Sequence, residues 1–356
     1  MKQLVKDYKR IVVKIGASLL YSDKNKVDFT VIDDIAGQIS HLVEDKKELV
    51  LVSSGAIACG MSILGLESRP KELSYLQAVA AIGQHELMNV YRKVFKERVL
   101  NCAQVLLTWE DFDDRKRYLN AKNTLLTLLK LGSIPIINEN DTVSTDEIKF
   151  GDNDRLSALV SSLISADILI ILSDVDGLLE KDKKTVIRVV DEITPQIKSL
   201  AHPTDKKTCV GGMITKIEAA KIAIDSGIPC VITNGRHRDI ILSTIKEPHS
   251  FGTLFIPKKG YLAAKKRWIA FSTKPKGKII VDEGARNALL NKKSLLAVGV
   301  IGVEGSFECG DIATVVTPKN RQIGIGKVGI SSKSLNDVKG KRFDKEVIHR
   351  DNIVIL

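Results

Sequence analysis

Two lysines stand at positions where a cation needs an anionic partner. Lys14 lies at the end of the apolar run RIVVKI, and burying its ammonium without a counter-charge would be costly. Lys216 follows Gly211-Gly212-Met213 near the expected start of a helix, where the helix dipole disfavours a cation unless an anion is also bound. A structural salt bridge would account for Lys14, and Lys216 could be an ordinary surface lysine on a helix. The alternative is that both bind an anionic substrate such as a phosphate group.

Another polar group, GDND at residues 151–154, precedes an apolar helical run. One side chain would be enough to cap that helix and to complement its dipole. A capped helix with additional surface charge is therefore one interpretation of Asp152, Asn153 and Asp154. The other is that these residues form one wall of a binding site, in which acidic groups could carry magnesium.

Glycine-rich turns could bind anions in two places. Gly211 and Gly212 would let backbone amides approach a phosphate closely. Ser53-Ser54-Gly55 offers hydroxyls and amides to a carboxylate or to a transferring phosphoryl group, although simple capping explains it equally well. With the lysines and acids, these turns suggest phosphoryl transfer from a nucleotide. The sequence has no GxxxxGK[ST], which excludes a Walker-type loop, and the GxGxxG at 324–329 is interpreted as a chance match.

Short β-branched runs alternate with longer amphipathic stretches through the first two-thirds of the chain. The pattern predicts strands at 10–15, 48–54, 102–107, 134–138, 168–173 and 229–233, and helices at 31–45, 75–95, 115–132, 154–166 and 214–227. Continuous apolar strands joined by helices indicate an α/β fold with a mostly parallel sheet sandwiched by helices. Ligands bind beyond the carboxyl ends of such strands, where the glycine-rich and acidic groups converge.

The composition is that of a globular protein with more than one domain. The chain has 356 residues, 44% of them hydrophobic and 27% charged, and no stretch is apolar for long enough to cross a bilayer. The amino end lacks an apolar signal core. Five scattered cysteines without a CxxC pair argue against a disulfide framework and a zinc site. We therefore expect a cytoplasmic protein with no membrane association.

The net charge of +11 belongs mainly to the last quarter of the chain. Residues 263–356 contain 18 Lys and Arg against 9 Asp and Glu, including the run KKRW at Lys265 to Trp268. A basic module of this size could bind RNA. A solvated lysine-rich face is the other interpretation, because few aromatic side chains accompany the charges.

The motifs, taken in order, resemble one known family. VVKIGASLL, LVSSGAIACGM, KRYLNAKNTL, IPIINENDTV, KFGDNDRLSALV, LSDVDGL and GGMITKIEAAKIA closely resemble segments of the glutamate 5-kinases, the proline-biosynthesis branch of the amino acid kinase family. The basic tail, with IIVDEGARNALL and SLLAVGV, resembles a PUA domain. The resemblance implies an amino acid kinase domain over residues 1–260 and a small β-rich PUA domain over 265–356.

The resemblance also implies roles for individual residues. Lys14 and Lys216 would neutralise the transferred phosphoryl group, and Asp154 would hold these two cations together. Glutamate would be bound by Ser54, Asp141 and Asn153, with Asn138 nearby and Asp152 contacting either substrate or magnesium. ATP would be bound by Ser173, Asp174 and the 210–216 segment, which contains Gly211, Gly212 and Met213.

The implied reaction uses ATP and Mg²⁺ and converts glutamate to γ-glutamyl phosphate, which a separate reductase would consume. Homo-oligomerisation is expected by analogy with the family. Three alternatives stay open at this point. The chain could be another acyl-phosphate or carbamate kinase of the same fold, an RNA-binding protein acting mainly through its tail, or a catalytically silent homologue.

Overall fold

A computed structural model describes residues 7–21, 28–144, 153–182, 184–201, 212–257, 264–271 and 275–355. The chain divides into two units, Met1–Asp111 with Arg115–Tyr261, and Phe112–Asp114 with Leu262–Leu356. No helix among these described residues is long and apolar enough to cross a membrane.

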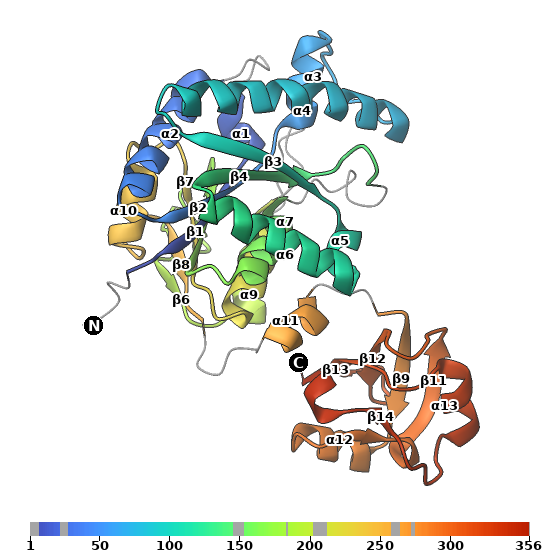
Figure 1. Ribbon diagram of the computed structural model, residues 1–356. Helices are drawn as coiled ribbons and strands as arrows, with labels where there is room; N and C mark the ends of the chain where they lie inside the picture. Colours follow the sequence, from blue (N-terminus) through green and yellow to red (C-terminus); the bar gives the residue numbers. More distant parts are fainter. Residues whose placement is uncertain are drawn as a thin grey trace. The chain divides into compact units, whose positions relative to one another are not determined.

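The first unit is built on an eight-stranded sheet in the order β3-β4-β2-β1-β5-β7-β8-β6 (Figure 1). Its strands are β1 (Arg10–Ile15), β2 (Glu48–Ser53), β3 (Asn101–Leu107), β4 (Ser133–Glu139), β5 (Ile168–Ser173), β6 (Val189–Val190), β7 (Cys230–Asn234) and β8 (Thr253–Phe255). All neighbouring pairs are parallel except β7 and β8. The predicted mostly parallel sheet is confirmed, and its antiparallel pair was not foreseen.

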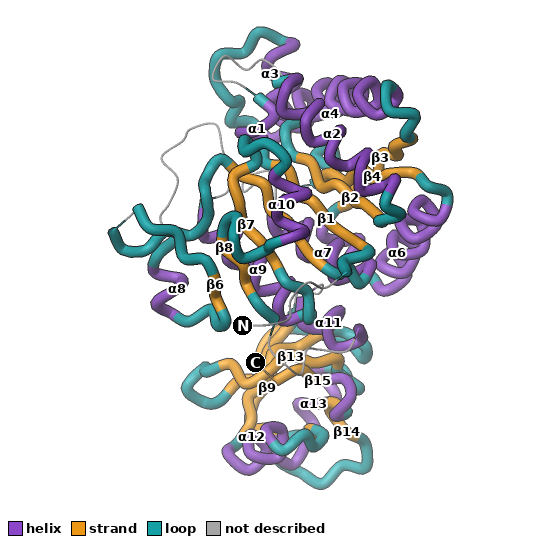
Figure 2. The backbone as a smooth tube through the Cα atoms, turned by 90° about the vertical axis from the view of Figure 1, so that its left-hand side faces the viewer, coloured by secondary structure: helices purple, strands orange, loops and turns teal. Residues whose placement is uncertain are grey.

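Helices cover both faces of this sheet (Figure 2). One layer contains α2 (Phe29–Glu44), α4 (Leu73–Lys96) and α10 (Ile240–Lys246), and the opposite layer contains α6 (Arg115–Lys130), α7 (Asn153–Ile164) and α9 (Met213–Asp225). The remaining helices up to residue 225 are α1 (Ala17–Leu20), α3 (Ala56–Ile63), α5 (Trp109–Asp113) and α8 (Pro195–Ser199). The predicted sandwich of helices around a sheet is therefore confirmed.

The centre of the sheet explains why its strands read as continuous apolar runs. β5 is buried along its whole length, and β1 and β2 are buried after their first residue. α7 packs against β1, β5, α6 and α9, and nearly all of its residues are buried. The polar groups in the first turn of α7 therefore lie beside the sheet rather than on a solvated surface.

The second unit is a smaller β-rich body. Its elements are α11 (Ala264–Phe271), β9 (Gly277–Val281), α12 (Glu283–Leu290), β10 (Leu295–Leu296), β11 (Val300–Gly305), β12 (Ile312–Val316), β13 (Gln322–Lys327), α13 (Ser332–Val338), β14 (Glu346–Ile348) and β15 (Ile353–Ile355). Five strands form a sheet in the order β11-β9-β12-β13-β15, and β10 pairs with β14. Its core includes Ile279, Val281, Phe307, Val315 and Ile348. A β-rich tail was expected from the resemblance.

Candidate active site

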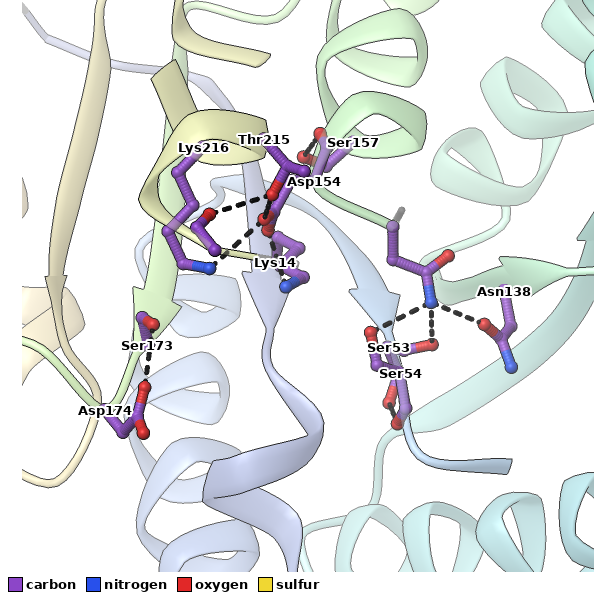
Figure 3. A network of polar contacts seen from close by, with 12 residues as sticks. Lys14, Ser53, Ser54, Asn138, Asp154, Ser157, Ser173, Asp174, Thr215 and Lys216 are labelled. Atoms are coloured by element: carbon purple, nitrogen blue, oxygen red, sulfur yellow. Dashed lines mark hydrogen bonds and ion pairs between the residues drawn. The ribbon is translucent and has the colours of Figure 1, made fainter. Parts of the chain in front are cut away.

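Two lysines share one carboxylate at the carboxyl edge of the sheet (Figure 3). Lys14 Nζ lies 2.6 Å from Asp154 Oδ1, and Lys216 Nζ lies 3.2 Å from Asp154 Oδ2. Lys14 comes from β1, Asp154 from the first turn of α7 and Lys216 from the first turn of α9. Three side chains far apart in the sequence therefore meet at one point, as the sequence analysis expected.

This cluster carries a surplus positive charge in a buried position. Lys14, Asp154 and Lys216 are 6%, 2% and 7% exposed. Burial alone would raise the pKa of Asp154, but the ammonium groups of Lys14 and Lys216 outweigh burial and hold its pKa well below the ordinary value. Among the described residues, two cations facing one carboxylate leave one positive charge uncompensated, and a buried uncompensated charge attracts an anion strongly.

Thr215 completes the cluster, and the sequence analysis did not single it out. Its hydroxyl lies 2.9 Å from Asp154 Oδ2, the oxygen that also faces Lys216. Thr215 is one residue before Lys216, so the first turn of α9 contributes both contacts to the same oxygen. In the sequence, Thr215 is only a polar residue next to Lys216. A threonine on the exposed surface of a helix would look the same, so the sequence did not reveal this contact.

A second cluster of amides and hydroxyls lies next to the charged one and begins with the neighbouring residue of α7. Asn153 Nδ2 lies 2.9 Å from Ser54 Oγ, 2.8 Å from Asn138 Oδ1 and 3.3 Å from the carbonyl oxygen of Ser53. Among the described residues, Asn153 Oδ1 is buried without a hydrogen-bond partner. A buried acceptor of this kind fits a donor on a substrate.

The sheet register brings these residues together. β1 pairs with β2 so that Lys14 lies beside Val52 and Ile15 beside Ser53, and β2 pairs with β4 so that Val52 lies beside Ile137. The ends of the three strands are therefore level. Gly55 then turns the chain into α3 with a φ of 112°, and a Cβ at this position would lie 2.7 Å from the Tyr21 ring. Only glycine satisfies both conditions.

Asp141 lies in the loop after β4, close enough to Arg69 for their charges to interact. Burial raises the pKa of Asp141 to about 6, and the guanidinium of Arg69 acts in the opposite direction. Arg69 was not among the residues identified from the sequence. The described contacts do not join Asp141 to the amide cluster.

The residues expected to face ATP lie at the ends of β5 and at the start of α9. Ser173 is buried, and its hydroxyl donates to Asp174 Oδ1 at 3.2 Å. Gly212 is the N-cap residue of α9, Met213 is its first residue, and Gly212 has no side chain with which to cap the helix. The uncapped amides at this position fit a phosphate.

Some expectations lie outside the described residues or outside the site. Asp152 and Gly211 are not among the described residues. Gly324 and Gly326 of the GxGxxG lie in β13, where added Cβ atoms would meet Val354 and Ile348, so packing accounts for these two glycines.

The carboxyl edge fits ATP better than a protein-held metal cluster. It offers uncapped amides at α9 and one surplus positive charge, both suited to phosphates. Within the described ranges, no three His, Cys, Asp or Glu side chains gather as they would around a metal ion. Mg²⁺ commonly uses one or two carboxylates together with substrate phosphates, which is compatible with this site.

The mostly parallel sheet is covered by helices on both faces and has a cationic cluster at its carboxyl edge. This arrangement is typical of α/β enzymes that bind phosphorylated substrates. Residues 9–234 match the model of the amino acid kinase family, and residues 277–350 match that of the PUA domain. The glutamate 5-kinases of Caldanaerobacter subterraneus subsp. tengcongensis and Thermoanaerobacter pseudethanolicus are 46% and 45% identical to this chain over 98% of each sequence. That of Paraburkholderia phymatum is 44% identical over the full length of both. The chain belongs to the amino acid kinase family.

Proposed function

We propose that this protein transfers the γ-phosphoryl group of ATP to the side-chain carboxylate of L-glutamate, the first step of proline biosynthesis. The observation that carries the proposal is the buried pair of lysines on Asp154, next to the amide cluster around Asn153. One cluster suits a phosphoryl group and the other suits an amino acid. The full-length relatives named glutamate 5-kinase support the same reaction.

Lys14 and Lys216 neutralise the charge that develops on the transferred group. The glutamate carboxylate attacks the γ-phosphorus in line, the bond from phosphorus to the bridging oxygen breaks, and ADP leaves with the electron pair. No general base is needed, because a carboxylate is already ionised at neutral pH. Asp154 keeps the two ammonium groups near each other although they repel, so the charge is in place before the reaction begins.

Glutamate binds on the side of α7 that carries Asn153. The buried Asn153 Oδ1 accepts a hydrogen bond from the substrate ammonium, and Ser54 Oγ and Asn138 lie beside it. Asp141 adds a negative charge for the same ammonium, and Asp152 is the remaining expected contact. An acceptor for the ammonium group favours an amino acid over a carboxylate that lacks an amine.

ATP binds along the ends of β5 and α9, against Ser173, Asp174, Gly211, Gly212 and Met213. The uncapped amides of α9 contact its phosphates, and Lys216 reaches the γ-phosphoryl group from the same turn. Bound Mg²⁺ would be held mainly by the ATP phosphates and would supply further neutralisation of the leaving group.

The test is a trapping assay with hydroxylamine, which converts an acyl phosphate into a stable hydroxamate. Purified protein with ATP and Mg²⁺ should form hydroxamate from glutamate, and far less from aspartate or acetylglutamate. Equal rates with all three substrates would favour a broader acyl-phosphate kinase. No product with any of them would support a catalytically silent homologue.

The product and the surface suggest two kinds of partner. γ-Glutamyl phosphate is labile in water, so a reductase that consumes it must act downstream and close by. Ile63, Leu64 and Ile82 are exposed on α3, on its C-cap and on α4, which is compatible with assembly of identical chains. Light scattering on the wild type and on Ile82→Glu tests this, because the substitution would lower the mass of an oligomer built through α4.

RNA is a second candidate ligand, for the PUA unit alone. A cavity of about 630 Å³ in this unit is lined by Lys293 and Arg350, by the acids Asp282 and Glu346, and by apolar residues that include Leu296. Its two basic side chains suit a phosphate backbone, and its apolar residues suit a stacked base.

A further inference from the structure

One face of α4 contacts the glutamate side of the site at three places. Gln77, Gln84 and Tyr91 are seven residues apart along this helix. A seven-residue step advances an α-helix by nearly two turns and drifts by only about 20°. The three side chains therefore lie in one row, which is here called the α4 row.

Each member of the α4 row contacts a different part of the site. Tyr91 Oη lies 2.8 Å from Ser53 Oγ at the end of β2. Gln84 Oε1 accepts from Asn138 Nδ2 at 2.7 Å, near the end of β4. Gln77 Nε2 donates to the carbonyl oxygen of Ser144, in the loop after β4, at 3.2 Å.

Ser53 Oγ lies within hydrogen-bond distance of two oxygens, Tyr91 Oη and, at 3.1 Å, the carbonyl oxygen of Ser54. Ser53 Oγ has one hydrogen, so when it donates to the carbonyl oxygen, which can only accept, Tyr91 is the donor to Ser53 Oγ. Tyr91 is 1% exposed, so a water molecule cannot easily replace it.

The backbone fixes the polarity of the Gln84 contact. The amide nitrogen of Glu139 can only donate, and it donates to Asn138 Oδ1 at 2.9 Å. Asn138 Nδ2 therefore points at Gln84, which must present its oxygen. Asn138 Oδ1 also accepts a hydrogen bond from Asn153 Nδ2. Gln84 therefore orients the side-chain amide of Asn138, and Asn138 in turn orients that of Asn153.

Both routes end at the same amide. From Tyr91 the contacts run through Ser53 to the backbone of Ser54, whose hydroxyl faces Asn153, and from Gln84 they run through Asn138. Figure 3 shows the part of these routes around Ser53, Ser54 and Asn138. The buried Asn153 Oδ1 can bind a substrate ammonium only if the amide keeps this orientation. None of the described hydrogen bonds of Gln84 or Tyr91 goes to Lys14, Asp154 or Lys216.

We propose that Gln84 and Tyr91 are positioning residues that set the affinity for glutamate and leave phosphoryl transfer unaffected. The proposal rests on the function proposed above, because it takes glutamate as the ligand of the amide cluster. Gln77 extends the same role to the loop that carries Asp141.

The test compares Tyr91→Phe and Gln84→Met with matched controls in the full-length protein. Tyr91→Phe keeps the ring, which stacks on Phe95 with centroids 6.3 Å apart, and removes only the hydroxyl. Tyr75→Phe makes the same change on α4 at a side chain that is 47% exposed. Gln104→Met repeats the glutamine change at an exposed position of β3.

Loss of one hydrogen bond of this kind should raise the KM for glutamate about 3- to 10-fold. The KM for ATP and kcat should stay within about twofold of the wild type on the same scale. The two control variants should match the wild type in all three constants.

Three results would count against the proposal. An unchanged KM for glutamate in both variants overturns it. A fall in kcat with both KM values unchanged indicates a structural role only, and a parallel rise in both KM values shows that the α4 row does not act on glutamate alone. If wild-type protein forms no hydroxamate from glutamate, the proposed function fails first and the inference fails with it.

Discussion

At the residue scale, the chemistry depends on two ammonium groups held close together by one carboxylate. Lys14→Ala and Lys216→Ala should each lower kcat at least about a hundredfold, because each removes charge neutralisation in the transition state. The hydroxamate assay at saturating substrates measures this. Lys221→Ala on α9 is the matched control, since Lys221 pairs with Asp225 on the exposed surface. Wild-type rates in either active-site variant would show that the lysine is only structural.

A second prediction at this scale concerns Asp141, whose raised pKa determines how the stability of the protein changes with pH. An acid whose pKa rises on folding, here from 3.8 to about 6, binds its proton more tightly in the folded state. The stability of the wild type should therefore fall as pH rises from about 4 through 6. Asp141→Asn lacks this charge, so it should melt roughly 3 °C or more above the wild type at pH 7.5, with the difference shrinking toward pH 4.

The control for that measurement is Asp176→Asn. Asp176 is exposed, and a hydrogen bond from Asn234 lowers its pKa, which is the opposite direction. This variant should not gain stability at pH 7.5. Equal melting temperatures of Asp141→Asn and the wild type at both pH values would contradict the raised pKa.

Some residues of the site could be predicted from the sequence, because their local positions are unusual for their type, and others could not. Lys14 and Lys216 were predicted to need an anion because their local positions are unfavourable for a cation, and the structure brings both to Asp154. Their catalytic roles stay predictions. Tyr91 gave no such signal, because a tyrosine on an amphipathic helix looks like any core residue. Its contact with Ser53 joins positions 38 residues apart and exists only in the folded chain.

At the element scale, long periodic segments were predicted well and short or atypical ones were not. The strand predicted at 168–173 matches β5, and the helix predicted at 115–132 differs from α6 by two residues at its end. α3 was not predicted, because its eight residues follow a glycine turn and are nearly all small or apolar, so no polar face marks a helix in the sequence. β8 is antiparallel to β7. Its three residues are all buried and do not differ in type from those of a parallel strand, so the sequence does not reveal its direction.

The close contact between α3 and α4 yields a prediction about stability and binding together. A Cβ at Gly83 would lie 1.8 Å from the carbonyl oxygen of Ala56, which is backbone and cannot move alone. Gly83→Ala should therefore cost about 1–3 kcal/mol of stability. Because α3 follows Ser54-Gly55 directly, the KM for glutamate should also rise.

Thermal melting and steady-state kinetics measure both effects. Gly37→Ala is the matched control within α2, since the nearest atom to its added Cβ is a guanidinium nitrogen of Arg98 at 3.8 Å. It should leave the KM unchanged and should be neutral or stabilising by up to about 1 kcal/mol, because alanine favours a helix over glycine. Equal stability of Gly83→Ala and Gly37→Ala would show that the two helices separate at little cost.

At the scale of the whole molecule, charge and chemistry are divided between the two units. Most of the net positive charge lies in residues 263–356, whereas the lysine cluster lies in the first unit. The excess of basic residues and the lysine cluster therefore belong to different units of the chain. The sequence predicted this division from composition, but it could not place the cavity of the second unit, since its lining comes from segments around α12, β10 and β14.

If the second unit binds RNA, binding by the full-length protein should weaken as salt increases, with a log–log slope of about 0.7 for each phosphate contacted on a single strand. Lys293→Glu with Arg350→Glu should weaken binding and reduce that slope by about 1 to 2. Lys319→Glu with Arg321→Glu makes the same charge change at exposed positions outside the cavity, so the slope should change less.

Fluorescence anisotropy over a salt series measures the affinity and the slope for each double variant. Identical slopes for the two double variants would mean that the cavity does not contact RNA and that the basic surface acts only as a solvated face.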